Sequence, residues 1–169
     1  MSKNNNSEAL RKLLINGFKF KLFLLKDLPM GFLAGMRVRE LTEEKGVVTI
    51  PYKYLTKNPF KSMYFACLAM AAELSTGILC IASTYKSKPK VSTLVLGIEG
   101  EFNKKAVGLI TFTCLDGKKI QEAVETSIHT GEGKIVTAMT TGVDEGGDQV
   151  AQFKITWSFK PKAEKKTSA

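Results

Sequence analysis

The chain contains few of the residues from which metal and redox sites are built. It has one histidine, His129, and three cysteines, Cys67, Cys80 and Cys114, with no CxxC pair among them. A zinc site of Cys/His type needs several such ligands at close spacing, so this composition argues against one. The cysteines are expected to be reduced thiols in the core, and no metal or redox cofactor is predicted.

The chain also lacks the charge pattern of a nucleic-acid-binding domain. Its net charge is +9, but residues 1–27 carry +4 and residues 160–169 carry +3, which leaves +2 for the body. Nucleic-acid-binding domains gather basic residues on one folded face with arginine or aromatic contacts among them, whereas the body holds only two arginines, Arg37 and Arg39. We interpret the charges as solvated basic ends and predict no nucleic-acid partner. Attraction to anionic cofactors or membrane surfaces remains the alternative.

No segment resembles a signal peptide, because the first residues are polar and the apolar run at residues 22–25 is short. A cytoplasmic location is therefore expected. A length of 169 residues fits one domain. We expect an N-terminal helix in residues 1–27, a folded domain in residues 28–160 and a disordered basic tail in residues 161–169.

Residues 7–26 place leucine and phenylalanine at intervals of three and four, with lysines elsewhere on the helical wheel. This pattern predicts a basic amphipathic helix, and Pro29 is interpreted as its stop. It is typical both of a helix on a membrane surface and of a helix packed against its own domain. The second interpretation is preferred, and peripheral membrane contact stays open.

The rest of the chain predicts one long helix surrounded by strands. Residues 36–41 and 46–51 are expected to form a hairpin, and residues 62–83 a helix that is apolar on nearly every side. Further strands are expected over residues 94–102, 107–114, 134–143 and 149–159, with a surface helix over residues 118–129. In the first of these strands, alternation places one set of apolar residues on a single face: Leu94, Leu96, Ile98 and Phe102. In the last strand, alternation places another set on the core face: Ala151, Phe153, Ile155, Trp157 and Phe159.

The helix over residues 62–83 is long enough to cross a bilayer, but Glu73 lies near its middle. A carboxylate at that depth costs about 2.5 to 3.5 kcal/mol on insertion, which favours a buried core helix. Burying it in a protein core is also costly unless it is paired or its pKa rises. Glu73 is therefore a candidate catalytic residue, and a structural ion pair is the alternative.

Two strands, a buried helix and four more strands predict an α+β domain in which an antiparallel sheet wraps the helix. This order resembles the hotdog fold. The segment from Asn58 to Glu73 resembles the active-site segment of the phenylacetyl-CoA thioesterase-like branch. In that branch a loop asparagine precedes a His-Gly-Gly motif and then an acidic residue in the central helix. The spacing of 15 residues agrees, and the chain is most similar to an uncharacterised subfamily with Glu in place of Asp.

The resemblance implies an acyl-CoA thioesterase that needs no cofactor, with coenzyme A as part of the substrate. Glu73 would be the general base or nucleophile, Asn58 would orient the water or the carbonyl, and the Phe65 backbone amide would donate to the oxyanion. Tyr64 and Ala66 would line the substrate pocket.

Three lysines, Lys86, Lys88 and Lys90, would meet the phosphates of coenzyme A, although a solvated basic loop is the preferred interpretation. The resemblance also implies a homodimer or a dimer of dimers. Glu73 of one protomer would then face Asn58 and the helix N-terminus of the other.

Tyr64-Phe65-Ala66 stands where the resembled branch has His-Gly-Gly. Phe65 keeps the backbone amide but adds a bulky side chain where glycine would allow close approach. A non-catalytic acyl- or lipid-binding hotdog protein is therefore the alternative to the thioesterase.

Overall fold

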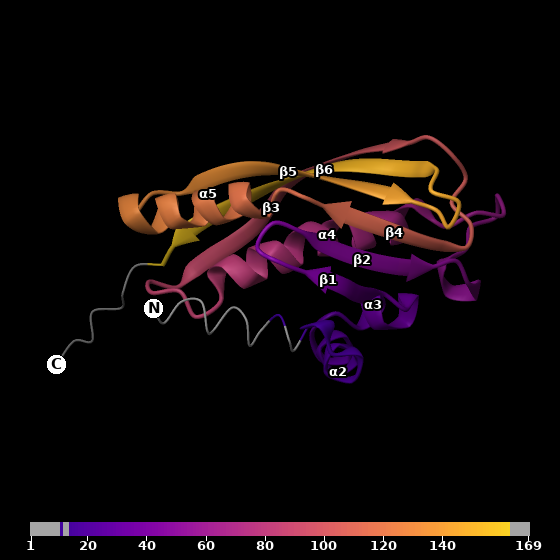
Figure 1. Cartoon of the computed structure of the whole chain (residues 1–169), viewed down its shortest axis with the longest axis horizontal. Helices are drawn as coiled ribbons and strands as arrows, with labels where there is room; N and C mark the ends of the chain where they lie inside the picture. The colour runs from indigo at the N-terminus through magenta and orange to yellow at the C-terminus, as the bar shows by residue number, and fades with distance from the viewer. Residues whose placement is uncertain (1–10, 12–13, 163–169) are drawn as a thin grey trace.

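The computed structural model describes residue 11 and residues 14–162. Its strands form one antiparallel sheet in the order β1-β2-β4-β5-β6-β3 (Figure 1). The elements in chain order are α2 (Gly17–Asp27), α3 (Pro29–Ala34), β1 (Arg37–Leu41), β2 (Gly46–Pro51), the 3₁₀ turn η1 (Tyr54–Thr56), α4 (Phe65–Thr84), β3 (Val91–Phe102), β4 (Leu109–Cys114), α5 (Gly117–Thr130), β5 (Lys134–Val143) and β6 (Gln149–Pro161). The hairpin, the long helix and the four later strands predicted from the sequence are all present.

The sheet curls around α4 (Figure 1). With a mean hydropathy of 1.9, α4 is apolar enough to cross a membrane, yet most of it is buried inside the fold. A helix of this kind must bury its surface against another element, and the apolar faces of the strands provide one. The expected α+β hotdog architecture is confirmed.

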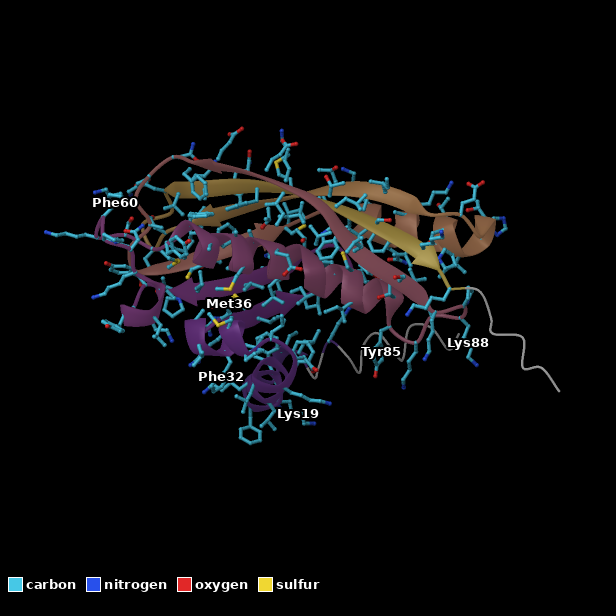
Figure 2. The ribbon with its side chains drawn as sticks, turned by 180° about the vertical axis from the view of Figure 1, so that it is seen from behind. Lys19, Phe32, Met36, Phe60, Tyr85 and Lys88 are labelled. Atoms are coloured by element: carbon cyan, nitrogen blue, oxygen red, sulfur yellow. The ribbon has the colours of Figure 1, made fainter. Side chains whose placement is uncertain are left out.

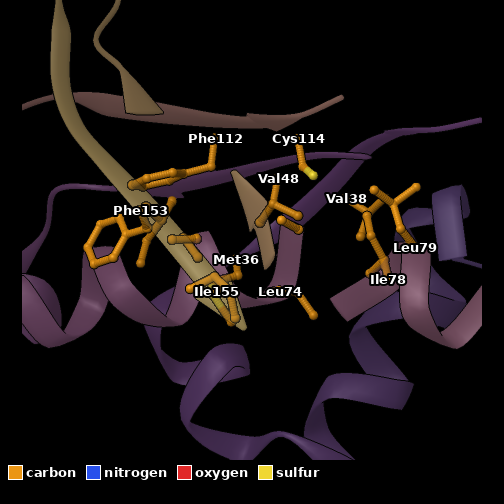
Figure 3. Packing of buried hydrophobic residues seen from close by; sticks show 14 of the residues in the cluster. Met36, Val38, Val48, Leu74, Ile78, Leu79, Phe112, Cys114, Phe153 and Ile155 are labelled. Carbon is orange, nitrogen blue, oxygen red and sulfur yellow. The ribbon is translucent and has the colours of Figure 1, made fainter. Parts of the chain in front are cut away.

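The core lies between α4 and the inner face of the sheet. Figure 3 shows Leu74 and Ile78 of α4 together with Phe112 of β4 and Ile155 of β6, and all four are almost completely buried. Burial of each such side chain contributes about 1.5 to 3 kcal/mol. The alternation predicted for the last strand is confirmed, because its inward residues are all buried: Ala151, Phe153, Ile155, Trp157 and Phe159.

The N-terminal helix α2 begins after Asn16, whose side chain accepts a hydrogen bond from the Lys19 amide at 3.1 Å. Of the helix predicted over residues 7–26, residues 7–10 and 12–13 lie outside the described residues, as does the tail after residue 162. A second helix, α3, was not predicted, because Pro29 was interpreted as a stop. Proline is tolerated in the first turn of a helix, and α3 runs on to a left-handed cap at Gly35.

β3 contains a bulge that the sequence did not predict. Val95 pairs with Trp157 and Gly97 pairs with Thr156, so Leu96 is one extra residue in the ladder. A single inserted residue moves every later side chain to the other face of the strand.

The bulge divides the apolar residues of β3 between two faces. Leu94 lies on the outer face of the sheet opposite Ser158, whereas Ile98 and Phe102 lie on the face toward α4. The prediction that these residues share one face with Leu96 is therefore wrong, because alternation holds only where the ladder is regular.

Candidate functional site

The first turn of α4 presents free hydrogen-bond donors. Tyr64 caps the helix without a side-chain hydrogen bond. The Cys67 and Leu68 amides donate to the Tyr64 carbonyl, whereas the Phe65 and Ala66 amides have no acceptor within the described chain. These two donors lie at the positive end of the helix dipole, so they are suited to a carbonyl oxygen that gains negative charge.

Asn58 organises the loop that leads into α4. Its Nδ2 donates to Ser62 Oγ and to the Met63 carbonyl, each at 3.1 Å. Its Oδ1 accepts from the Phe60 amide at 2.9 Å and from the Ser62 amide at 3.3 Å. Both ends of the Asn58 amide are therefore used inside residues 58–63, and its predicted contact with water or a carbonyl stays a prediction.

One stripe of α4 is not covered by the sheet. Its residues recur at helical spacing and are only half-buried: Ala66, Ala69, Met70, Glu73 and Ile81. The prediction of a helix buried on every side is wrong along this stripe, because the edge strand β3 does not close over it within one chain. Glu73 is the one ionisable residue among these five.

The Glu73 carboxylate has no hydrogen bond and no ion pair within the described chain. Burial raises the pKa of the Glu73 carboxyl above its usual value. Its Oε1 lies close to Gly77, because a Cβ atom built on Gly77 would be 3.3 Å from Glu73 Oε1. An unpaired carboxylate of this kind is a candidate for proton transfer.

The helix around Glu73 is tied to the sheet. Trp157 Nε1 donates to Thr76 Oγ1 at 2.9 Å, and Thr76 Oγ1 donates to the Glu73 carbonyl at 2.9 Å. One turn of α4 is thus joined to β6, so the Glu73 backbone is held in place while its carboxylate remains unpaired.

Within one chain Glu73 and the three lysines lie away from the predicted site residues at the start of α4. Glu73 follows Phe65 by eight residues, about 12 Å along the helix axis. Asn58 lies in the loop before that turn. Lys86, Lys88 and Lys90 are exposed, and Figure 2 shows Lys88 and Phe60 at opposite ends of the molecule.

A row of aromatic rings joins the start of α4 to the end of β3. The rings of Tyr64 and Phe65 have centroids 4.9 Å apart, those of Phe65 and Phe102 6.5 Å, and those of Phe102 and Phe153 5.5 Å. Sequence reasoning missed Phe102 as a site residue. Phe102 and Phe65 are far apart in the sequence, so no local pattern could predict that their rings are in contact.

β3 has a free edge that is apolar on both faces. One side of the strand pairs with β6, and no described strand pairs with the other. Leu94, Leu96, Ile98 and Phe102 are each about half exposed. A long apolar edge is a template for pairing with another strand.

The comparisons with known proteins agree with this architecture. The family model described as "Domain of unknown function (DUF4442)" matches residues 19–159. No curated protein sequence matches the chain.

Solved structures with this fold come from several organisms. PA5026 from Pseudomonas aeruginosa, described as a protein of unknown function and "Probable Thioesterase", is 20% identical with a TM-score of 0.73, over 89% of this chain and 99% of that chain. OLEI01261 from Chlorobaculum tepidum, of unknown function, is 11% identical with a TM-score of 0.70, over 88% and 99%. Thioesterase HI1161 from Haemophilus influenzae is 14% identical with a TM-score of 0.63, over 88% and 93%. At these identities the similarity shows the fold alone.

Proposed function

Because the chain belongs to the DUF4442 family and has the fold of thioesterases such as HI1161, we propose that it is an acyl-CoA thioesterase. The observation that carries the proposal is the unpaired Glu73 carboxylate on the uncovered stripe of α4. A hydrolytic site needs a base that is neither neutralised by a partner nor fully solvated, and among residues 11 and 14–162 Glu73 meets both conditions. The catalytic domain comprises residues 28–160, and a cytoplasmic location is part of the proposal.

The active site forms between two copies of the chain. In this assembly the free edge of β3 pairs with β3 of a second copy in antiparallel orientation, so that the start of one strand meets the end of the other. The Phe65–Phe102 contact supports this arrangement, since it joins the helix N-terminus to the end of β3. A homodimer is the minimal unit, and a dimer of dimers is compatible with the same contact.

Antiparallel pairing also explains how distant residues act together. Lys88 and Lys90 directly precede Val91 at the start of β3. The start of the partner's β3 would lie beside Phe102, so the partner's lysines would approach the Phe65 end of α4. Exposed lysines there would attract the phosphates of coenzyme A.

In the proposed reaction the thioester oxygen accepts hydrogen bonds from the Phe65 and Ala66 amides. Glu73, approaching from the other protomer, takes a proton from a water molecule as the water oxygen bonds to the carbonyl carbon. The C–S bond then breaks, and the proton held by Glu73 passes to the coenzyme A thiolate, which restores the carboxylate. Glu73 stands where the resembled branch has an aspartate. In an alternative form of this mechanism the Glu73 carboxylate attacks the carbonyl carbon directly.

A second function is favoured by a specific observation. The half-exposed rings of Tyr64 and Phe65 flank the free amides, and the Asn58 side chain is fully occupied by its own loop. A protein that binds acyl groups or lipids without hydrolysing them would have these features.

A panel of acyl-CoA esters assayed by free-thiol release tests the proposal. We expect release by the wild-type protein and its loss in Glu73→Ala. Glu122→Ala, which removes an exposed carboxylate from α5, is the matched control and should keep the activity. Release that is absent from the wild type, or undiminished in Glu73→Ala, would reject the catalytic claim. Saturable acyl-CoA binding without release would instead support the second function.

A further inference from the structure

The N-terminal helix α2 has an apolar face that the fold leaves uncovered. Phe20 and Leu24 are buried against the domain, as the sequence predicted for a packed helix. Phe18, Leu22 and Leu25 lie on the opposite side and are 73%, 52% and 54% exposed. Exposed apolar residues on an ordinary protein surface are scattered singly, whereas these three large side chains lie together in one stripe.

Lysines border this stripe on both sides. With about 100° between successive helical residues, Lys21 falls on one flank of the stripe and Lys19 and Lys26 on the other. All three lysines are exposed, and Asp27 at the end of the helix is the one acidic residue in α2. An apolar stripe between two rows of lysines is the arrangement of a helix that lies in the plane of a membrane surface.

The same character continues beyond α2. In α3 the side chains of Met30 and Leu33 are exposed, and the neighbouring η1 exposes Tyr54 and Leu55. Lys57 lies over the Tyr54 ring at 4.4 Å, which adds another cation to this part of the surface. In Figure 2, Lys19 and Phe32 lie at the side of the molecule away from the sheet, where a flat partner can approach.

We propose that the α2–α3 face, formed by Phe18, Leu22, Leu25, Met30 and Leu33 with the flanking lysines, docks the protein on an anionic lipid bilayer. The apolar side chains would enter the boundary between headgroups and acyl chains. The lysine stems would extend along them and place their ammonium groups among the lipid phosphates.

Charge complementarity selects this occupant over a second copy of the chain. If two α2–α3 faces packed together, the lysines of one copy would lie beside the lysines of the other, and their like charges would repel. An anionic membrane neutralises the same lysines.

Flotation with vesicles tests the proposal on the full chain. Vesicles of phosphatidylcholine with about 30% phosphatidylglycerol are compared with vesicles of phosphatidylcholine alone, since each lysine near an anionic surface adds to binding. We expect at least about tenfold stronger binding to the anionic vesicles, and weaker binding as salt is added. A variant with Lys19→Gln, Lys21→Gln and Lys26→Gln should lose most of this preference.

A second variant removes the apolar stripe through Phe18→Gln, Leu22→Gln and Leu25→Gln, and we expect it to bind at least about tenfold more weakly. The matched control changes three exposed apolar residues on another face, Leu115→Gln, Ile135→Gln and Met139→Gln, and should bind as the wild type does. Thermal melting of each variant checks that it is folded.

A labelled variant tests the contact directly. All three native cysteines are buried, so a cysteine introduced by Phe18→Cys can be labelled selectively with a polarity-sensitive dye. We expect a blue shift on anionic vesicles at this position and none for Leu115→Cys. Absence of the shift, wild-type binding by the stripe variant, or a change in oligomeric mass in place of vesicle binding would overturn the proposal.

Discussion

The ring of Phe65 lies edge-on to the ring of Phe102, so the first residue of α4 contacts the last residue of β3. This contact joins the two free amides of the helix to the unpaired edge of the sheet. Any strand that pairs along β3 therefore reaches the candidate oxyanion site.

Glu73→Gln is expected to abolish thioester hydrolysis and to stabilise the protein. Burial raises the pKa of Glu73, so the folded state binds more protons than the unfolded state once pH exceeds the ordinary glutamate value. The free energy of unfolding therefore falls as pH rises from the ordinary glutamate pKa to the raised pKa of the folded state. Glutamine does not titrate, so the variant does not lose this free energy as pH rises. The Tm of the variant should exceed that of the wild type only slightly near about pH 4 and by about 3 °C near about pH 8. Thermal melts across this range measure it, and an equal gain at both pH values contradicts the assignment.

Gly97→Lys is expected to convert the proposed dimer into a monomer. A Cβ atom at Gly97 meets no atom within 4 Å, so the side chain fits the single chain. Gly97 lies near the middle of β3, and antiparallel self-pairing would bring the two new lysines close together, where like charges repel. Light scattering after gel filtration measures the mass. Gly133→Lys, away from the free edge, should leave it unchanged, and an unchanged mass for Gly97→Lys contradicts pairing through β3.

Asn58→Ala is expected to lower Tm by about 4 °C, because the side-chain hydrogen bonds of Asn58 within this partly exposed loop are lost and together contribute about 2 kcal/mol. Ser62→Ala removes a smaller part of the same network and should lower Tm by about half as much. If Asn58 also positions substrate, Asn58→Ala should lower kcat far more than Ser62→Ala does. Equal kcat values in the two variants would limit Asn58 to shaping the loop.

Phe65→Gly is expected to raise kcat/KM for bulky acyl groups by about tenfold, because the backbone amide becomes accessible from more directions. The same change should lower Tm by a few degrees, since glycine weakens the first turn and the contact with Phe102 is lost. Steady-state kinetics and melting curves measure the two effects. Phe60→Ala, which removes an exposed ring from the preceding loop, should change neither, and a lower kcat/KM in Phe65→Gly would show that the ring binds substrate.

Charge reversal of Lys86, Lys88 and Lys90 to glutamate is expected to raise KM for acyl-CoA about tenfold while leaving kcat within about twofold, since these exposed lysines would act by attraction of phosphate. An acyl thioester of N-acetylcysteamine, which has no phosphate, serves as the control substrate. Its KM should not change. Equal effects on both substrates would contradict a phosphate contact.

Much of the fold follows from patterns that are local in sequence. The alternation of Phe153, Ile155 and Trp157 assigns the inner face of β6, because each side chain direction depends only on its neighbours in the strand. The apolar length of α4 likewise required a sheet to cover it. Those features were predicted correctly.

The prediction failed where one residue changed the local rule. The bulge at Leu96 moved Ile98 and Phe102 to the face toward α4, although the apolar alternation of the sequence continues across it without a break. Pro29 was interpreted as a stop although it lies in the first turn of α3. The first error concerns the register between β3 and β6, and the second concerns the place of proline within a helix.

The sequence by itself determined the α+β class, the wrapped helix, and Asn58 and Glu73 as candidates, because periodicity and an isolated carboxylate can be recognised without coordinates. Only the tertiary structure decided which stripe of α4 stays open, that the Phe65 and Phe102 rings meet, and that Phe18, Leu22 and Leu25 face outward. These properties depend on contacts between residues far apart in the chain, and the free energy of such contacts is not encoded in any local pattern.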